Sequence, residues 1–141
     1  MKFHYLKFPL KERSGLFGHA ILKPIIPIEL LYEDKRLRYA ALIDSGADFC
    51  IFDAEIGEQL GINIQSGTKE IFSGIQEKGG ATAFLHKITI NIGGWDHPVT
   101  VGFSSDIAKH GFGILGQRGF FDVFVVKFDF LKEEIELKER K

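Results

Sequence analysis

The sequence predicts a mainly β fold with one or two short helices, and three observations support this class. Apolar and polar residues alternate over several short stretches, most clearly over 86–92, as in strands with one buried face. Glycine and proline separate these stretches at short intervals, as turns between strands do. The 141 residues, 45% of them hydrophobic, suffice for one real core, so we expect a single domain over residues 1–141.

The strands follow from apolar stretches bounded by turn-forming residues. Pro9 is expected to end the first strand, and residues 1–19 would form an N-terminal strand or extension. Pro24 and Pro27 favour an edge strand or an extended crossing segment for the next stretch. Extended stretches are expected over 2–8, 19–31, 37–43, 49–52, 68–72, 81–92, 99–103, 112–115, 125–131 and 135–137.

A short helix is expected over 54–60, in the first half of the chain. Asp53 can cap its N-terminus, Glu55 lies in its first turn and Gly61 can end it. A glycine-rich segment over 74–80 follows later and joins two strands into a long hairpin.

An Asp-Ser-Gly turn lies between two apolar stretches and is the most informative feature of the chain. Asp44 would stand at the end of a strand with apolar walls, where an unpaired charge is unfavourable. It therefore either accepts hydrogen bonds or shares its proton with a neighbouring acid. Gly46 permits a sharp turn, which the Ser45 hydroxyl can hold through a local hydrogen bond. The alternative is a strand-end turn with no chemical role.

Other motifs for catalysis or ligand binding have less support. Residues 111–116 match the G-x-G-x-x-G pattern of dinucleotide sites, but a polar loop precedes them and too little chain follows for a βαβ unit. The five histidines lack metal-ligand spacing, and no serine lies in a Gly-x-Ser-x-Gly elbow. Cys50, the single cysteine, is expected to be a small buried hydrophobe. We expect neither a metal nor a cofactor.

The charge balance disfavours two classes of partner. With 18 basic and 19 acidic side chains the net charge is −1, which gives no electrostatic footprint for nucleic acid or an anionic membrane. The first ten residues lack the apolar core of a signal peptide, and no apolar run reaches bilayer length. We therefore expect a soluble cytoplasmic protein that binds polypeptides.

Two motifs give the sequence a resemblance to the retropepsin-like aspartic proteases, the retroviral-type single-domain branch of the pepsin superfamily. The first is the run Leu42-Ile43-Asp44-Ser45-Gly46-Ala47. The second, about seventy positions later, is Gly113-Ile114-Leu115-Gly116, which matches the hydrophobic-hydrophobic-Gly element beside the family's catalytic turn. The tail over 119–129 also resembles the helix and closing strand of cellular members.

The resemblance implies a closed-barrel acid-protease fold and an aspartic endopeptidase in which Asp44 is catalytic. Supporting residues would lie in the catalytic turn, in a flap over the substrate and in the hydrophobic-hydrophobic-Gly element. Ser45, Gly46 and Ala47 would support the catalytic turn, and Ser73, Gly74 and Ile75 would belong to the flap. The hydrophobic-hydrophobic-Gly element would be Ile114, Leu115 and Gly116.

Aspartic proteolysis uses two facing carboxylates, whereas this chain has one Asp-[Ser/Thr]-Gly. The resemblance therefore implies a symmetric homodimer that binds its polypeptide substrate as an extended strand. Retroviral members commonly carry an arginine directly after the second glycine, where it can pair with an acid like Asp48 and help the dimer. Here Gln117 takes that position, with Arg118 next. Two alternatives stay open: a catalytically inactive β-barrel that serves as a peptide-binding or dimerisation module, and a monomer that needs a different partner subunit.

Overall fold

The computed structural model describes residues 1–72, 80–107 and 111–140. This part of the chain is built almost entirely from strands, with one α-helix and one 3₁₀ helix. The elements in chain order are β1 (Lys2–His4), β2 (Leu6–Ser14), β3 (Gly18–Lys23), β4 (Ile25–Tyr32), β5 (Lys35–Ile43), β6 (Ile51–Asp53), α1 (Ala54–Gln59), η1 (Ile64–Ser66), β7 (Thr68–Phe72), β8 (Ala81–Ile92), β9 (Trp95–Ser104), β10 (Gly113–Leu115), β11 (Phe124–Asp129) and β12 (Glu134–Glu139).

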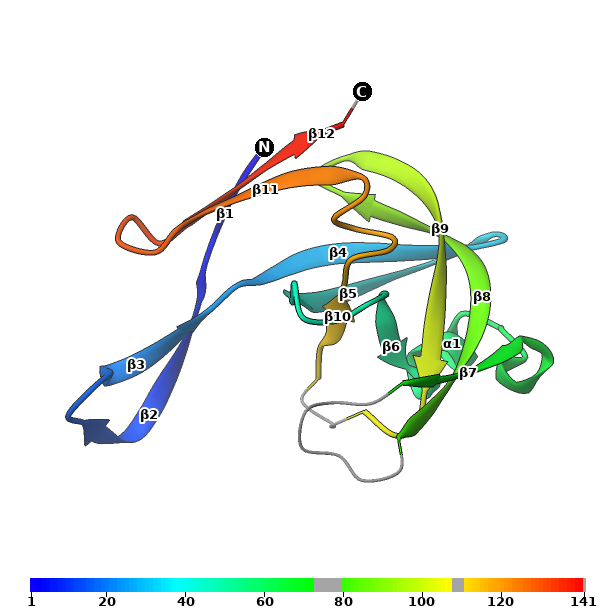
Figure 1. The fold of residues 1–141 in the computed structure, drawn as a ribbon, viewed down its shortest axis with the longest axis horizontal. Coiled ribbons are helices and arrows are strands. Elements are labelled where there is room, and N and C mark those ends of the chain that lie inside the picture. Colours follow the sequence, from blue (N-terminus) through cyan, green and yellow to red (C-terminus); the bar gives the residue numbers. More distant parts are fainter. Residues whose placement is uncertain (73–79, 108–110, 141) are drawn as a thin grey trace.

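Seven of these strands form one sheet, in which six close into a ring and β7 pairs with β8 outside the closure. The order is β4-β5-β10-β6-β9-β8-β7, and an additional antiparallel pairing of β4 with β8 closes the sheet into a ring (Figure 1). Most pairings are antiparallel, but β10 runs parallel to β5 and β6 runs parallel to β9. This closed, mainly β architecture confirms the predicted fold class.

The interior of the ring is filled by branched aliphatic and aromatic side chains. The alternation over 86–92 places Ile88, Ile90 and Ile92 of β8 in the core, as expected for a strand with one buried face. Each such side chain contributes roughly 1.5–3 kcal/mol through its burial. The largest fully buried side chains are Phe52, Phe103, Phe120, Phe124, Ile26, Leu30, Leu60, Ile90, Ile92, Leu115, Ile135 and Leu137.

The helix begins and ends close to where the sequence predicts. The Asp53 carboxylate accepts a hydrogen bond from the Glu55 main-chain nitrogen at 3.0 Å, which caps the first turn of α1. Gly61, just past the end, has a φ of 85°, a value that glycine adopts without strain. Among the described residues, no helix is long and apolar enough to cross a membrane.

Two strand boundaries near prolines differ from the prediction. The first strand does not end at Pro9: β1 stops at His4, and β2 runs through Pro9 to Ser14. Pro9 pairs with Ala20 in a two-stranded ribbon, where a proline can turn its missing N–H toward an open edge. The stretch expected over 19–31 is divided at Pro24 into β3 and β4.

The helix expected after Gly119 is also absent, because turns occupy residues 119–123. The Phe124 main-chain nitrogen donates to the Phe120 carbonyl at 2.9 Å, and this makes a single turn that is not continued. Asp122 holds the turn by accepting from the Gly119 nitrogen at 2.9 Å. Phe120 and Phe124 are fully buried with ring centroids 5.4 Å apart, so packing of this aromatic pair determines the local conformation.

The two ends of the chain lie together outside the ring. β1, β12 and β11 form a three-stranded antiparallel sheet (Figure 1). The amino group of Met1 donates to the Leu137 carbonyl at 2.9 Å, and the Leu137 nitrogen donates to the Met1 carbonyl at 2.8 Å. β2 and β3 form a separate two-stranded ribbon that projects away from the ring.

His97, on β9, is a half-buried titratable group whose two ring nitrogens are shielded from solvent. Neither ring nitrogen makes a hydrogen bond, and the ring packs edge-on against Phe124 at a centroid distance of 5.5 Å. Burial lowers the pKa of His97, although the Gly119 main chain and nearby carboxylates oppose the effect. His97 is therefore protonated at a higher pH in the unfolded chain than in the folded protein. Stability should fall as the pH drops through the ordinary histidine value of about 6.5.

We expect His97→Phe to reduce this pH dependence, because phenylalanine keeps the aromatic contact and does not titrate. Urea unfolding at about pH 7.5 and about pH 5.5 gives the free energy of unfolding at both values. The difference between the two should be smaller in the variant than in the wild type. His4→Phe, at an exposed position on β1, is the matched control and should leave the difference unchanged. The same difference in His97→Phe as in the wild type would contradict the expectation.

Candidate active site

The parallel pairing of β5 with β10 fixes the position of Asp44. Ala41, Leu42 and Ile43 pair in register with Gly113, Ile114 and Leu115, so the carboxyl ends of both strands lie at the same edge. The Asp44 main-chain nitrogen donates to the Leu115 carbonyl at 2.9 Å. Leu115 is fully buried and Ile114 half-buried, so the residue that anchors Asp44 is itself part of the core.

The Asp44 side chain closes the turn that follows the strand. Its Oδ1 accepts a hydrogen bond from the Gly46 main-chain nitrogen at 2.9 Å, and the Ala47 nitrogen donates to the Asp44 carbonyl at 3.1 Å. Asp44 and Ala47 are half-buried, whereas Ser45 and Gly46 are exposed. The turn therefore presents a carboxylate in a fixed orientation that solvent can reach.

Gly116 allows a second segment to lie directly against this turn. The Gln117 nitrogen donates to the Ala47 carbonyl at 2.8 Å, and the Arg118 nitrogen donates to the Asp48 carbonyl at 2.9 Å. A Cβ atom at Gly116 would lie 2.7 Å from the Ala47 carbonyl oxygen and closer still to that of Phe49. No ordinary side chain fits there, because both obstacles are main-chain atoms. The hydrophobic-hydrophobic-Gly element thus lies beside the Asp-Ser-Gly turn.

Gln117 makes a contact that the sequence did not reveal. Its Nε2 donates to the main-chain carbonyl of Ser45 at 2.7 Å, so it holds the turn from the side. The ion pairs of the described residues are Lys7 with Glu133 and Arg36 with Glu29, so Arg118 does not pair with Asp48. In the sequence, this contact was indicated only by the position of Gln117 directly after Gly116. An amide-to-carbonyl hydrogen bond stands here in place of the ion pair that the resemblance implied.

The proposed flap residues Ser73, Gly74 and Ile75 lie outside the described residues. The structure does describe the strands on either side, which pair antiparallel as the predicted hairpin from Thr68 opposite Leu85 to Phe72 opposite Ala81. Rings of Phe72 and Phe49 meet edge to face at 6.0 Å. The hairpin therefore has an aromatic contact with the segment that follows the Asp-Ser-Gly turn.

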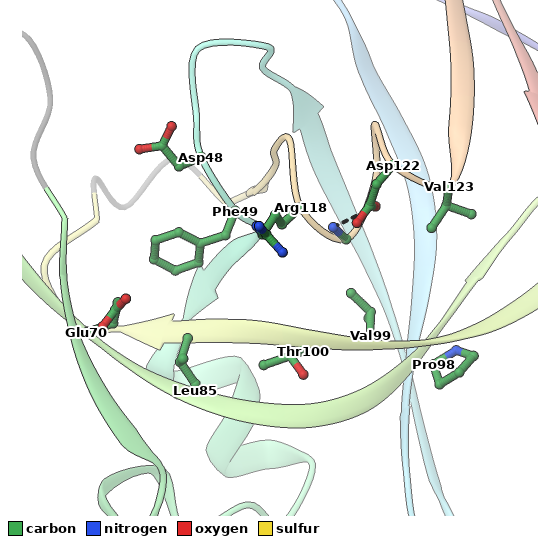
Figure 2. A pocket seen from close by; sticks show the side chains of 11 residues that line it. Asp48, Phe49, Glu70, Leu85, Pro98, Val99, Thr100, Arg118, Asp122 and Val123 are labelled. Carbon is green, nitrogen blue, oxygen red and sulfur yellow. Dashed lines mark hydrogen bonds between the residues drawn. The ribbon is translucent and has the colours of Figure 1, made fainter. Parts of the chain in front are cut away.

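An open pocket of about 520 Å³ lies next to the turn (Figure 2). Figure 2 shows Arg118 and Asp122 on one wall, facing the strand that carries Val99 and Thr100. The lining combines apolar side chains with three acids and one base, which suits a polar or basic group with an aliphatic stem. The lining residues are Asp48, Phe49, Glu70, Leu85, Pro98, Val99, Thr100, Arg118, Gly119, Asp122 and Val123.

The structure confirms the prediction that Cys50 is a small buried hydrophobe. The residue is fully buried, with its Sγ 3.5 Å from the Arg118 carbonyl oxygen. Burial raises the pKa of the Cys50 thiol to about 12, so it stays protonated near neutral pH and is a poor nucleophile. Across the part of the chain that the structure describes, no three histidine, cysteine or acidic side chains are grouped to hold a metal ion.

No protein-family model matches the sequence, and no curated protein is significantly similar to it. Among solved structures, a retropepsin-like aspartic protease from Rickettsia conorii matches with a TM-score of 0.57 and 13% identity, over 97% of this chain and 92% of that chain. The EIAV protease in complex with the inhibitor HBY-793 matches over 75% of this chain and 88% of that chain, with 21% identity and a TM-score of 0.46. The first likeness, together with the closed sheet described above, shows that the chain has the fold of the retropepsin-like aspartic proteases.

Proposed function

We propose that the chain is an aspartic endopeptidase whose active form is a homodimer. One observation carries the proposal: the Asp44 carboxylate is half-buried at the end of β5, oriented by the Gly46 N–H and anchored through the buried Leu115. The chain holds one such turn, so a pair of carboxylates requires a second copy. The fold shared with the Rickettsia conorii protease supports this assignment.

In the proposed dimer, Asp44 and its mate face each other across the two-fold axis. Two carboxylates at such a distance share one proton, and their titration belongs to the pair. The ionised carboxylate takes a proton from a water molecule as the water oxygen attacks the peptide carbonyl carbon. The protonated carboxylate donates a hydrogen bond to the carbonyl oxygen, and a proton then passes to the nitrogen as the C–N bond breaks. The products are a carboxylic acid and an amine.

The substrate would bind as an extended strand between the catalytic turn and the hairpin of β7 and β8. Ser73, Gly74 and Ile75 would belong to the flap that closes over it and excludes water. The pocket beside Asp48 would then receive an outer side chain of the peptide. Because acids outnumber bases in its lining, a lysine or arginine would fit better there than an acid.

Mixing wild type with Asp44→Asn tests whether two copies share one active site. At equal amounts and random pairing, about one quarter of the dimers keep both aspartates. Peptide cleavage should therefore fall to about a quarter at constant total protein, whereas a site within one chain would leave about half. The assay uses a peptide library between mildly acidic and neutral pH. Asp34→Asn, at an exposed position in the turn between β4 and β5, should leave cleavage unchanged when it is mixed in the same way.

Cleavage that follows the wild-type fraction linearly would contradict a shared site. A wild-type protein that binds peptides but cleaves none of them at any pH would contradict the protease and favour the inactive peptide-binding module.

A further inference from the structure

The β2–β3 ribbon, here called the arm (residues 6–23), has apolar side chains that one copy of the chain does not cover. No residue of the two strands is buried. Phe8 lies opposite Ile21 on one face, and at the tip Leu16 and Phe17 are 83% and 52% exposed. A two-stranded ribbon alone is marginally stable in water, so an additional surface is needed to cover this one.

Both ends of the arm are fixed, and one of them adjoins the candidate active site. The Pro24 carbonyl, directly after the arm, accepts a hydrogen bond from the Ile43 nitrogen at 2.9 Å. At the other end, the Tyr5 nitrogen donates to the Glu133 carbonyl at 3.0 Å. The arm therefore leaves the ring next to the residue that precedes Asp44, at the edge where a second Asp44 must approach in the proposed dimer.

The arm and the rest of the chain carry opposite charges. The arm holds four basic residues and one acid, which gives it a net charge of +3. Because the whole chain has a net charge of −1, the remainder carries −4. The basic residues are Lys7, Lys11, Arg13 and Lys23, and the acid is Glu12. Lys7 pairs with Glu133 of its own chain at 3.4 Å, so Lys11, Arg13 and Lys23 are the charges that attract an arm to the body of another copy.

We propose that each arm clasps the body of the other copy in the dimer, with Leu16 and Phe17 as its apolar anchors. This inference rests on the proposed homodimeric protease, and it identifies the segment that holds the two copies together. The arm supplies binding energy that the missing arginine at Gln117 does not. A basic arm with an apolar tip could also suit an anionic membrane. A second copy is favoured because the remainder of the chain is acidic and because one end of the arm adjoins Ile43, directly before Asp44.

Sedimentation equilibrium on Asp44→Asn chains tests the proposal independently of catalysis. Adding Leu16→Ser with Phe17→Ser, at exposed positions, should raise the dimer dissociation constant about tenfold or more. Adding Lys11→Glu with Arg13→Glu should also raise it, and this second effect should shrink at high salt. Matched controls outside the arm are Leu131→Ser, at a side chain 93% exposed, and Lys127→Glu with Lys132→Glu. Neither control should change the dissociation constant as the arm variants do.

Equal dissociation constants in arm and control variants would overturn the proposal, as would an Asp44→Asn chain that is strictly monomeric. Binding to phosphatidylserine vesicles that both arm variants lose without a change in dimerisation would assign the arm to a membrane instead. Failure of the proposed function gives a different result: a wild-type dimer that cleaves no peptide, in which the effect of the arm on dimerisation is still measurable. In an active dimer, the arm variants should regain cleavage at high protein concentration.

Discussion

Replacement of Asp44 by asparagine is expected to abolish peptide cleavage while the fold is retained. The amide oxygen of asparagine can accept the same hydrogen bond from Gly46, so the turn should keep its conformation. The amide cannot take a proton from water, however, and kcat should fall by roughly 10²- to 10⁴-fold or more. Cleavage of the best peptide from a library and urea unfolding measure the two effects separately.

Asp48→Asn is the matched control for this experiment. It makes the same chemical change four positions further along, at an exposed side chain, and leaves intact the main-chain hydrogen bond from Arg118. Cleavage of peptides that do not extend into the neighbouring pocket should be close to that of the wild type. Equal loss of activity in the two variants, or none in Asp44→Asn, would remove Asp44 from the catalytic role.

Gly116→Ala is expected to damage both stability and activity. The added methyl group would overlap the Ala47 and Phe49 carbonyl oxygens, which belong to the main chain and cannot rotate away. Overpacking of this kind lowers the free energy of unfolding by about 1–3 kcal/mol or more. Because the displaced segment runs beside the Asp-Ser-Gly turn, the proposed cleavage by the molecules that remain folded should also fall.

Gly15→Ala is the control for the general effect of replacing glycine by alanine. Gly15 lies in the turn between β2 and β3, and a Cβ atom there would meet nothing within 4 Å. Its free energy of unfolding should change by less than about 1 kcal/mol. Chemical denaturation compares the two variants, and equal stability would show that the segments around Gly116 move apart easily.

The Asp-Ser-Gly turn and the Asp53 cap could be predicted because their interactions are local. In both, a carboxylate accepts from a nitrogen two residues later. The sequence indicated the Asp53 cap directly, whereas at the turn it assigned the local hydrogen bond to the Ser45 hydroxyl and the structure shows it at the Asp44 carboxylate. The strand β8 was predicted for a similar reason, because the alternation of apolar and polar residues in its sequence indicates which face is buried.

The remaining features depend on partners far away in the sequence. Leu30 pairs with Ile90 where the ring closes, and no local pattern relates these two strands. The hydrogen bond from Gln117 to Ser45 joins residues that are 72 positions apart. The helix expected after Gly119 fails for the same reason, because burial of Phe120 and Phe124 against the core outweighs the local resemblance.

The contact between β1 and β12 has a consequence for the order of the elements along the chain. Met1 and Leu137 exchange two hydrogen bonds, so a short linker could join the ends without disturbing either strand. New ends could then open at the exposed turn over 33–34, between β4 and β5. Such a circularly permuted chain could still form all the strand pairings of the ring. Asp44 would then lie within about ten residues of its new N-terminus. The site is a property of the closed architecture, independent of where the polypeptide starts.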